Sequence, residues 1–373
     1  MKNQIILLIL FVIAMICLPF LAFEKHQDKS DIPYTPPPET QKEIQVFGED
    51  IVEPDESVDK TDLEKSKSED EPETVQDFDG GEKYDVESFK ILDLTSGKVD
   101  TVPVLDYVIG TVMSEIPASY QVEAIKAQAV AAHTYALHHH LTQLENPDPN
   151  LKGADFSADP SSHQGFMTTD TAKERFGTKY NEYYKKISAA VSEVIDQILI
   201  YDDEPIIAAY HAISAGQTED AANVWKGSAD YLVAVDSKGD EYSPEYESIV
   251  AVTFDELKTA MSKENPDVVF DGDDPEKWVE IVSKSDSGYI TEIRVGDTTM
   301  SGMDFRTMLG LRSSNFSISF SGNGFAFVVK GYGHGVGMSQ YGSDYMARQG
   351  AKYREILGHY YQNTEIVNIK SKK

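Results

Sequence analysis

The stretch from residue 331 to residue 342 combines several side chains that could contact a ligand. It reads Gly-Tyr-Gly-His-Gly-Val-Gly-Met-Ser-Gln-Tyr-Gly, so five of its twelve residues are glycine, and His334 lies between two tyrosines. Glycine takes left-handed backbone angles and lets a backbone approach a ligand closely, at an entropic cost. No Gly-Lys-Ser/Thr ending is present, which disfavours a phosphate-binding loop. Aromatic faces, an imidazole and amide groups suit a neutral polyhydroxylated ligand; the alternative is a glycine-rich turn into a helix from about residue 339.

Glu115 is the second residue of interest, because it ends an apolar segment directly before Ile116 and Pro117. If its carboxyl group is partly buried, desolvation raises the pKa and suits the group to act as a general acid near neutral pH. The alternative is a structural carboxylate that caps the following helix or forms an ion pair with Lys126. The residues by themselves leave both interpretations open.

Histidines and a serine elsewhere give weaker indications of chemistry. His211 and Ser214 suggest a serine hydrolase, but Ala212 breaks the Gly-x-Ser-x-Gly pattern and no acid partner is placed by the sequence. Three consecutive histidines, residues 138–140, point around a helix and cannot all face one metal ion. A frayed, solvated helix end is expected there.

These side chains must be positioned by helices and hairpins that the residue pattern outlines. A helix is expected over residues 104–115, ending before Pro117, since the residue that precedes a proline avoids the helical conformation. The other expected elements are helices at 121–141, 172–191, 254–263, 302–311, 339–349 and 353–361, and strands at 86–94, 98–104, 197–201, 206–210, 248–252, 278–283, 289–295, 316–321, 325–330 and 365–369. Helices mixed with antiparallel hairpins predict an α+β fold, in the form of a two-lobed head.

The composition separates an N-terminal segment from this head. Residues 5–23 are almost wholly apolar, and at about 1.5 Å per residue such a run can cross a hydrocarbon core of roughly 30 Å. A transmembrane anchor over residues 1–23 is favoured over a cleaved signal peptide, because the run is long and no small-x-small site follows it. Residues 24–83 are acidic and poor in apolar surface, which predicts a disordered tether. Residues 84–373 then form an extracytoplasmic head, with an inserted lobe around residues 236–330.

Charge and cysteine content exclude several classes of function. The formal net charge is −30, whereas nucleic-acid binding needs a basic surface that releases phosphate counterions. The same charge argues against docking on anionic lipid. Cys17 is the sole cysteine, so the chain cannot form a disulfide framework or a cysteine-ligated zinc site by itself.

Five segments occur in an order that resembles the stage II sporulation protein D family. They are residues 106–117 (beginning Asp-Tyr-Val-Ile-Gly and ending Glu-Ile-Pro), 123–132 (Glu-Ala-Ile-Lys-Ala-Gln-Ala-Val-Ala-Ala), 210–219 (beginning Tyr-His and ending Thr-Glu), 306–313 (Arg-Thr-Met-Leu-Gly-Leu-Arg-Ser) and 331–342. The similarity extends over residues 86–369, and the last of these motifs is highly specific.

The resemblance implies a lytic transglycosylase that cuts peptidoglycan between N-acetylmuramic acid and N-acetylglucosamine during endospore engulfment, leaving a 1,6-anhydro end. Family members prefer strands stripped of stem peptides, and they work with a SpoIIP-like amidase and a SpoIIM-like membrane protein at the mother-cell engulfing membrane. The family's catalytic glutamate matches Glu115. The residues expected to line the glycan groove are His211, Ser214, Gln217, His334, Gln340 and Tyr341. A non-catalytic glycan-binding protein or amidase enhancer is the alternative.

The chain departs from the family pattern at three places. Some relatives bind zinc in the loop that matches residues 155–164, but both cysteine positions hold other residues here, so no metal and no cofactor are expected. Residues 212–216 read Ala-Ile-Ser-Ala-Gly in place of the usual Ser-Thr-Ser-Gly-Gly, and His133 stands where arginine is common. These changes concern the details of the groove more than the reaction.

Overall fold

The computed structural model describes residues 75–78, 84–94, 96–158, 162–225, 227, 229–270 and 274–369. The predicted anchor and nearly all of the predicted tether lie outside these ranges. Within them, no helix is both long enough and apolar enough to span a bilayer. A short piece of the predicted tether is included: Gln76–Phe78 form β1, which pairs with the last strand, β15 (Glu365–Ile369).

The helices follow the sequence-based expectation at most positions. In chain order they are α2 (Val104–Glu115), α3 (Val122–Glu145), α4 (Thr169–Phe176), α5 (Tyr180–Val194), α6 (Ala221–Val224), α7 (Phe254–Glu264), α8 (Gly302–Leu309), α9 (Gln340–Arg348) and α10 (Tyr353–Tyr360). The single helix predicted over residues 172–191 is wrong, because α4 and α5 replace it. They separate at Gly177, whose φ of +51° is a left-handed conformation that favours glycine.

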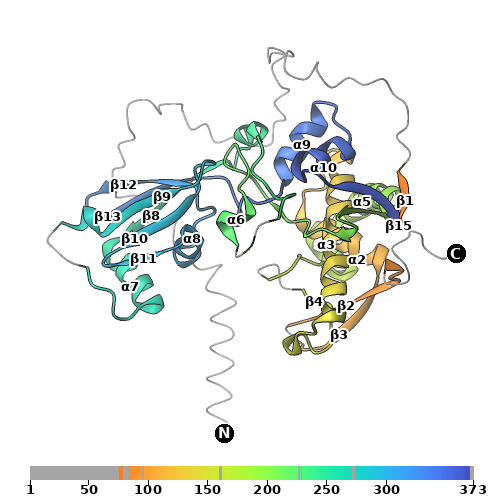
Figure 1. Ribbon diagram of the computed structural model, residues 1–373, viewed down its shortest axis with the longest axis horizontal. Helices are drawn as coiled ribbons and strands as arrows, with labels where there is room; N and C mark the ends of the chain where they lie inside the picture. Colours follow the sequence, from red (N-terminus) through yellow and green to blue (C-terminus); the bar gives the residue numbers. More distant parts are fainter. Residues whose placement is uncertain are drawn as a thin grey trace, which may run out of the picture. The chain divides into compact units, whose positions relative to one another are not determined.

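The strands form several small sheets (Figure 1). The remaining strands are β2 (Ser88–Leu92), β3 (Val99–Pro103), β4 (Phe156–Ser157), β5 (Gln197–Tyr201), β6 (Glu204–Pro205), β7 (Tyr210–His211), β8 (Glu247–Thr253), β9 (Val279–Lys284), β10 (Ile290–Val295), β11 (Thr298–Met300), β12 (Phe316–Ser321), β13 (Gly324–Lys330) and β14 (Met338–Ser339). Their orders are β1-β15-β5-β6, β3-β2-β4, β12-β13-β8, β11-β10-β9 and β14-β7. This mixture of helices and sheets confirms the α+β class.

Antiparallel hairpins account for only part of the strand pairing. β1 pairs with β15, β2 with β4, and β7 with β14 in parallel, and Figure 1 shows β1 and β15 side by side although they come from opposite ends of the described chain. A hairpin follows β5 as expected, but its return strand is β6 (Glu204–Pro205) and not residues 206–210. Asp202 and Asp203 both take positive φ angles in a tight turn, so Glu204–Pro205 already pair with β5.

The larger hydrophobic core is organised around α3. The small side chains of Ala129, Ala132 and Ala136 are buried on this helix, and such residues allow neighbouring helices to approach closely. α3 packs against α2, α5, α9 and α10. The end of α2 and the start of α9 are thereby positioned by the same helix, which brings Glu115 and Gln340 together.

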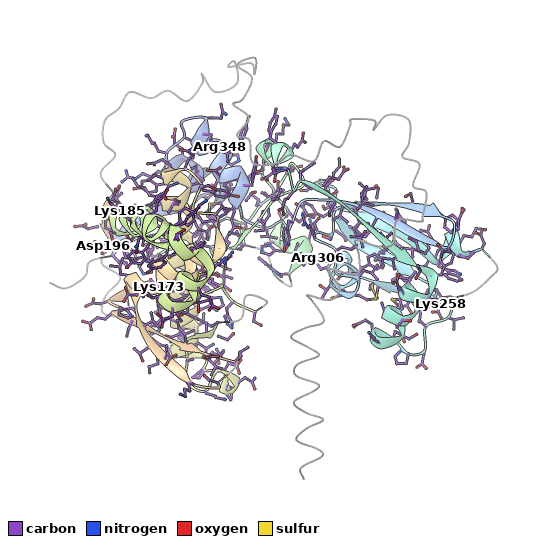
Figure 2. The ribbon with its side chains drawn as sticks, turned by 180° about the vertical axis from the view of Figure 1, so that it is seen from behind. Lys173, Lys185, Asp196, Lys258, Arg306 and Arg348 are labelled. Atoms are coloured by element: carbon purple, nitrogen blue, oxygen red, sulfur yellow. The ribbon has the colours of Figure 1, made fainter. Side chains whose placement is uncertain are left out.

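A second core is built from residues between Val252 and Val329, within the stretch predicted as an inserted lobe. It lies among the β12-β13-β8 and β11-β10-β9 sheets and the helices α7 and α8. Thr253 and Glu256 form a capping box with reciprocal hydrogen bonds at the start of α7. Lys258 projects from α7 (Figure 2), and its Nζ lies 4.3 Å from the centre of the Trp278 ring.

Candidate active site

Glu115 is the last residue of α2 and is partly buried. Its Oε1 accepts a hydrogen bond of 2.6 Å from the backbone N–H of Gly165, and the side chain of Gln340 donates a second hydrogen bond to the carboxyl group. Burial raises the pKa of Glu115 above its ordinary value, although both hydrogen bonds act in the opposite direction. A raised pKa keeps a carboxyl group protonated closer to neutral pH, as a general acid requires.

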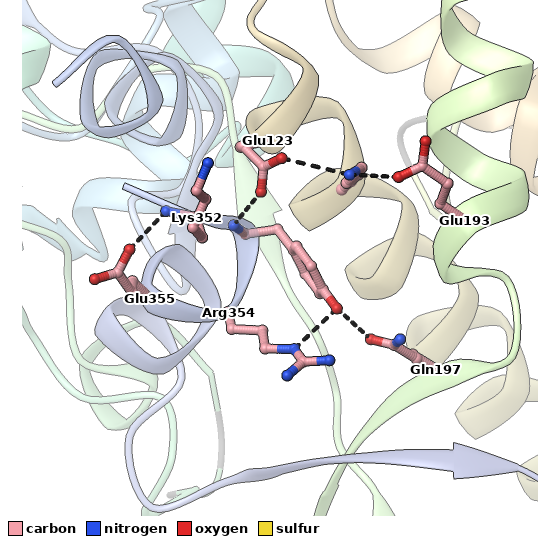
Figure 3. A network of polar contacts seen from close by, with 8 residues as sticks. Glu123, Glu193, Gln197, Lys352, Arg354 and Glu355 are labelled. Atoms are coloured by element: carbon pink, nitrogen blue, oxygen red, sulfur yellow. Dashed lines mark hydrogen bonds and ion pairs between the residues drawn. The ribbon is translucent and has the colours of Figure 1, made fainter. Parts of the chain in front are cut away.

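The alternative for Glu115, an ion pair with Lys126, is wrong. Lys126 Nζ lies 2.6 Å from Glu193 and 3.4 Å from Glu123, in a network that joins α3, α5 and α10 (Figure 3). In the same network, Glu123 accepts a hydrogen bond of 3.0 Å from the backbone N–H of Tyr353. Because Lys126 is committed to this network, it does not offset the cost of burying Glu115.

Neutral polar side chains surround the carboxyl group of Glu115. Burial raises the pKa of three tyrosines, Tyr107, Tyr135 and Tyr210, and the charge of the neighbouring carboxylate adds to the effect. Gln164 links two of them, since its Nε2 donates to the Tyr107 hydroxyl at 3.1 Å and its Oε1 accepts from the Tyr210 hydroxyl at 2.7 Å. These groups are uncharged at neutral pH, which suits a neutral sugar.

The parallel pair of β7 and β14 fixes the glycine-rich stretch against the segment that carries Tyr210 and His211. Gly337, directly before β14, has a φ of +72°, and a Cβ atom there would lie 2.0 Å from the carbonyl oxygen of Ala209. The sequence predicted a close backbone approach for this stretch. At Gly337 the partner is the protein's own backbone.

We expect Gly337→Ala to lower the free energy of unfolding by roughly 3 kcal/mol or more, because it combines a left-handed φ with a backbone clash. Gly350→Ala is the matched control: Gly350 also has a left-handed φ, of +101°, but nothing lies within 4 Å of a Cβ atom there. Its cost should be about 1–2 kcal/mol. Urea unfolding of both variants measures the difference, and equal losses would contradict the steric argument.

His211 and His334 are neutral at physiological pH. Burial and the neighbouring His334 lower the pKa of His211 to about 3, and the two ring centres are 5.7 Å apart. Burial and the charge of Arg306, which lies on α8 (Figure 2), lower the pKa of His334 to about 4. His334 Nδ1 accepts from the backbone N–H of Val336 at 3.1 Å, and the ring also hydrogen-bonds to the backbone of Tyr210. These bonds make His334 an organiser of the glycine-rich stretch.

Asp240 is a buried carboxyl group to which no sequence pattern points. It has no exposed surface and lies in the 3-10 helix Lys238–Tyr242. Its oxygens accept hydrogen bonds from the backbone N–H of Ser214 at 3.0 Å and from the hydroxyl groups of Ser237 at 2.9 Å and Ser339 at 2.7 Å. Burial nevertheless raises the pKa of Asp240. This carboxyl group ties the segment after β7 to the residue that caps α9.

The prediction that Ser214 lines the groove needs correction. Ser214 has no exposed surface, and its Oγ accepts a hydrogen bond of 3.2 Å from the backbone N–H of Gly216. A fully buried side chain cannot touch a glycan strand. Its contribution is to the hydrogen bonding of Asp240, which no periodicity along the chain could indicate.

The other predicted groove residues are divided between buried and accessible positions. His211 and Gln340 are largely buried, at 4% and 6% exposure. Gln217 and Tyr341 remain partly exposed, and the Tyr341 hydroxyl donates to the carbonyl oxygen of Tyr242 at 3.0 Å. Gln340 is the predicted residue that contacts Glu115 directly.

Comparisons with known proteins decide the family. A family model described as Stage II sporulation protein (SpoIID) matches residues 94–201. The stage II sporulation protein D of Bacillus subtilis (strain 168) is 33% identical over 268 residues, which are 72% of this chain and 75% of that protein. The chain belongs to the stage II sporulation protein D family. The protein of the same name from Bacillus amyloliquefaciens is 31% identical over 79% of this chain and 83% of its own length.

A more distant relative is the amidase enhancer of Bacillus subtilis (strain 168). It is 23% identical over 317 residues, which cover 69% of this chain and 40% of that protein. One relative of this chain is therefore named for an amidase and not for glycan cleavage.

Residues 155–158 and 162–164, the described parts of the segment where the sequence departs from some family members, make side-chain contacts. His140 Nδ1 lies 2.8 Å from Asp155 Oδ1, and His163 Nδ1 lies 3.0 Å from Ser157 Oγ. The frayed end predicted for residues 138–140 is wrong, because α3 continues to Glu145 and all three histidines have partners. His139 lies against His163 and His140 against Asp155, whereas His138 Nδ1 lies 2.8 Å from the carbonyl oxygen of Pro205. In the part of the chain that the structure describes, no group of three or more His, Cys, Asp or Glu side chains is arranged to hold a metal ion.

Two exposed aromatic side chains at the glycine-rich stretch are not among the residues predicted to line the groove. Trp225 is 39% exposed, and its ring centre lies 5.3 Å from that of His334. Tyr332 is 43% exposed and packs against the guanidinium group of Arg312 at 5.2 Å. Exposed aromatic faces can cover the apolar side of a sugar ring. The sequence offered one signal for Trp225: it is one of only two tryptophans in the chain, and it lies outside every predicted helix and strand.

Proposed function

We propose that this protein is a membrane-anchored lytic transglycosylase that cleaves the glycan strands of peptidoglycan during engulfment in sporulation. The observation that carries the proposal is the setting of Glu115, a partly buried carboxyl group with a raised pKa among neutral tyrosines and glutamines. Such a group can donate a proton when neutral and accept one when ionised. Membership of a sporulation family supports a role at the cell wall.

One carboxyl group is sufficient for the proposed reaction. Protonated Glu115 gives its proton to the glycosidic oxygen as the bond between N-acetylmuramic acid and N-acetylglucosamine breaks. The carboxylate then accepts the proton of the C6 hydroxyl of muramic acid while the C6 oxygen forms a bond to C1. The products are a 1,6-anhydro end and a free hydroxyl group, and Glu115 is protonated again. Water is not the nucleophile, so the second carboxylate of hydrolytic glycosidases is not required.

A neutral strand fits this protein better than a strand that carries stem peptides. Stem peptides bear carboxylates, and a net charge of −30 repels them. The exposed rings of Trp225 and Tyr332 and the partly exposed side chains of Gln217 and Tyr341 would hold neutral sugars by stacking and hydrogen bonding. These features support a preference for strands already stripped of peptides.

The proposal also includes location and partners. Residues 1–23 would anchor the protein in the mother-cell engulfing membrane, and residues 24–83 would let the head reach the wall outside the cytoplasm. The proposed partners are a cell-wall amidase, which would supply the stripped strands, and a further membrane protein of the engulfment complex. Both partners come from the family resemblance.

A second function is favoured by one specific observation, the similarity to an amidase enhancer. In that case the head would hold glycan or an amidase without cutting the strand. Glu115 would then have a structural role, and its raised pKa would not contribute to catalysis.

Incubation of the full-length protein with stripped glycan strands distinguishes the two functions. We expect products with 1,6-anhydro ends, identified by mass spectrometry, and the same rate with or without a chelator. Strand binding without any anhydro product would overturn the transglycosylase and favour the binding protein. Products with reducing ends would indicate hydrolysis by water.

A further inference from the structure

Gln128 is a buried side chain of α3 that contacts the first residue of α9. Only 1% of its surface is exposed, and its Oε1 accepts a hydrogen bond of 3.4 Å from Nε2 of Gln340. The Nε2 of Gln128 has no hydrogen-bond partner within the described residues. A buried donor without a partner costs free energy, so a side chain that carries one calls for a functional explanation.

The amide group of Gln340 supplies that explanation. Its nitrogen donates to Gln128, and the same side chain donates to the carboxyl group of Glu115. If the Gln340 amide alone were rotated by half a turn, its oxygen would face two acceptors, Gln128 Oε1 and the carboxyl group of Glu115. A turn of both amides would leave the ionised carboxylate facing an oxygen. The arrangement in the structure is the one that gives ionised Glu115 a donor.

We infer that Gln128 is a positioning residue, which holds the amide of Gln340 so that it donates to the carboxyl group of Glu115. The benefit of this role rests on the proposed function, in which Glu115 is the catalytic acid and base. The contacts of Gln340 with Gln128 and Glu115 are present whether or not the protein cleaves glycan. Other ionisable groups face the carboxyl group from α2, α3 and β7, namely Tyr107, Tyr135 and Tyr210. All three titrate far above the range in which Glu115 does, so they do not obscure its titration.

The test is the titration of Glu115 in the full-length protein, labelled with carbon-13 at the glutamate carboxyl groups. Loss of one signal in Glu115→Gln identifies the resonance. In Gln128→Met, which keeps the side-chain length, we expect the pKa of Glu115 to rise by roughly half a unit or more, because its donor is no longer held. Gln121→Met is the matched control, since Gln121 is an exposed residue at the start of the same helix and makes no side-chain capping bond.

Two further measurements separate positioning from a merely structural role. Gln340→Met should raise the pKa of Glu115 by at least as much as Gln128→Met, and the double variant should add nothing, because Gln128 acts through Gln340. Gln128→Met should also unfold at a urea concentration close to that of the wild type, since the variant removes an unpaired donor and, with it, only a long hydrogen bond of 3.4 Å.

An unchanged or lowered pKa in Gln128→Met, additive shifts in the double variant, or a markedly less stable or unfolded Gln128→Met protein would each overturn the inference. The titration does not depend on glycan cleavage. The expected pKa shifts in a protein that makes no anhydro product would refute the proposed function and leave the positioning role in place.

Discussion

Replacement of Glu115 by glutamine should lower the rate of anhydro-product formation by roughly 10²- to 10⁴-fold, the usual contribution of a general acid–base group. Glutamine keeps the size of the side chain and an oxygen that can accept the 2.6 Å hydrogen bond from Gly165. It cannot protonate the glycosidic oxygen or take the proton of the C6 hydroxyl. Initial rates on stripped strands, followed by mass spectrometry of the anhydro ends, measure the effect.

Glu174→Gln is the control for this variant, because Glu174 is an exposed glutamate on α4. Its rate should equal that of the wild type. If Glu115→Gln cleaves strands as fast as the wild type does, the assignment of Glu115 is wrong even though the protein is a transglycosylase.

The same glutamine variant should be at least as stable as the wild type at neutral pH. Burial raises the pKa of Glu115 in the folded protein, so the folded state binds this proton more tightly than the unfolded chain does. The stability that this group contributes is therefore present below its unfolded pKa and is lost as the pH rises through the folded pKa. Glutamine does not titrate. The free energy of unfolding of the variant, measured with urea, should therefore increase relative to that of the wild type as the pH rises toward neutrality.

Removal of the Asp240 carboxyl group should have the largest effect on folding. We expect Asp240→Ala to lower the free energy of unfolding by roughly 3–5 kcal/mol, because it leaves the N–H of Ser214 and two buried hydroxyl groups without their acceptor. Such a loss is a large part of the 5–15 kcal/mol that typically holds a domain together. Urea unfolding at neutral pH measures it.

Asp236→Ala provides the matched control four residues away. The side chain of Asp236 is 61% exposed, and its contact with Lys238 is a surface ion pair of 3.3 Å. Replacing it should change the free energy of unfolding by no more than about 0.5–1 kcal/mol. If the two alanine variants lose equal stability, Asp240 does not hold the segment after β7 to α9.

Elements with local signals were predicted well from the sequence. Apolar spacing and Pro117 predicted the helix that ends at Glu115. The strands expected at 316–321 and 325–330 match β12 and β13, which flank Gly322-Asn323-Gly324, a strong turn sequence. The capping box of α7 lies within four residues. In each case the physical cause acts between neighbours in the chain, so the residue types alone contain it.

Predictions failed where a contact joins distant segments. Tyr210–His211 pair in parallel with Met338–Ser339 and not with β5. The partner strand belongs to the glycine-rich stretch, more than a hundred residues later in the chain. Lys126 has the charge and position to pair with Glu115, but α5 offers Glu193 at 2.6 Å instead. The residues next to Tyr210 and those next to Lys126 in the chain do not indicate which partner each of them takes.

By itself the sequence determined the family, the helix that ends at Glu115 and the glycines that permit a close backbone approach. Only the tertiary structure decided that Glu115 is partly buried, that Gln340 is its donor, and that Ser214 belongs to the buried surroundings of Asp240. The reason is that a carboxyl pKa and a side chain's exposure depend on which groups exclude water around it. Those groups come from α3, α9 and the loop at Gly165, and packing alone brings them together.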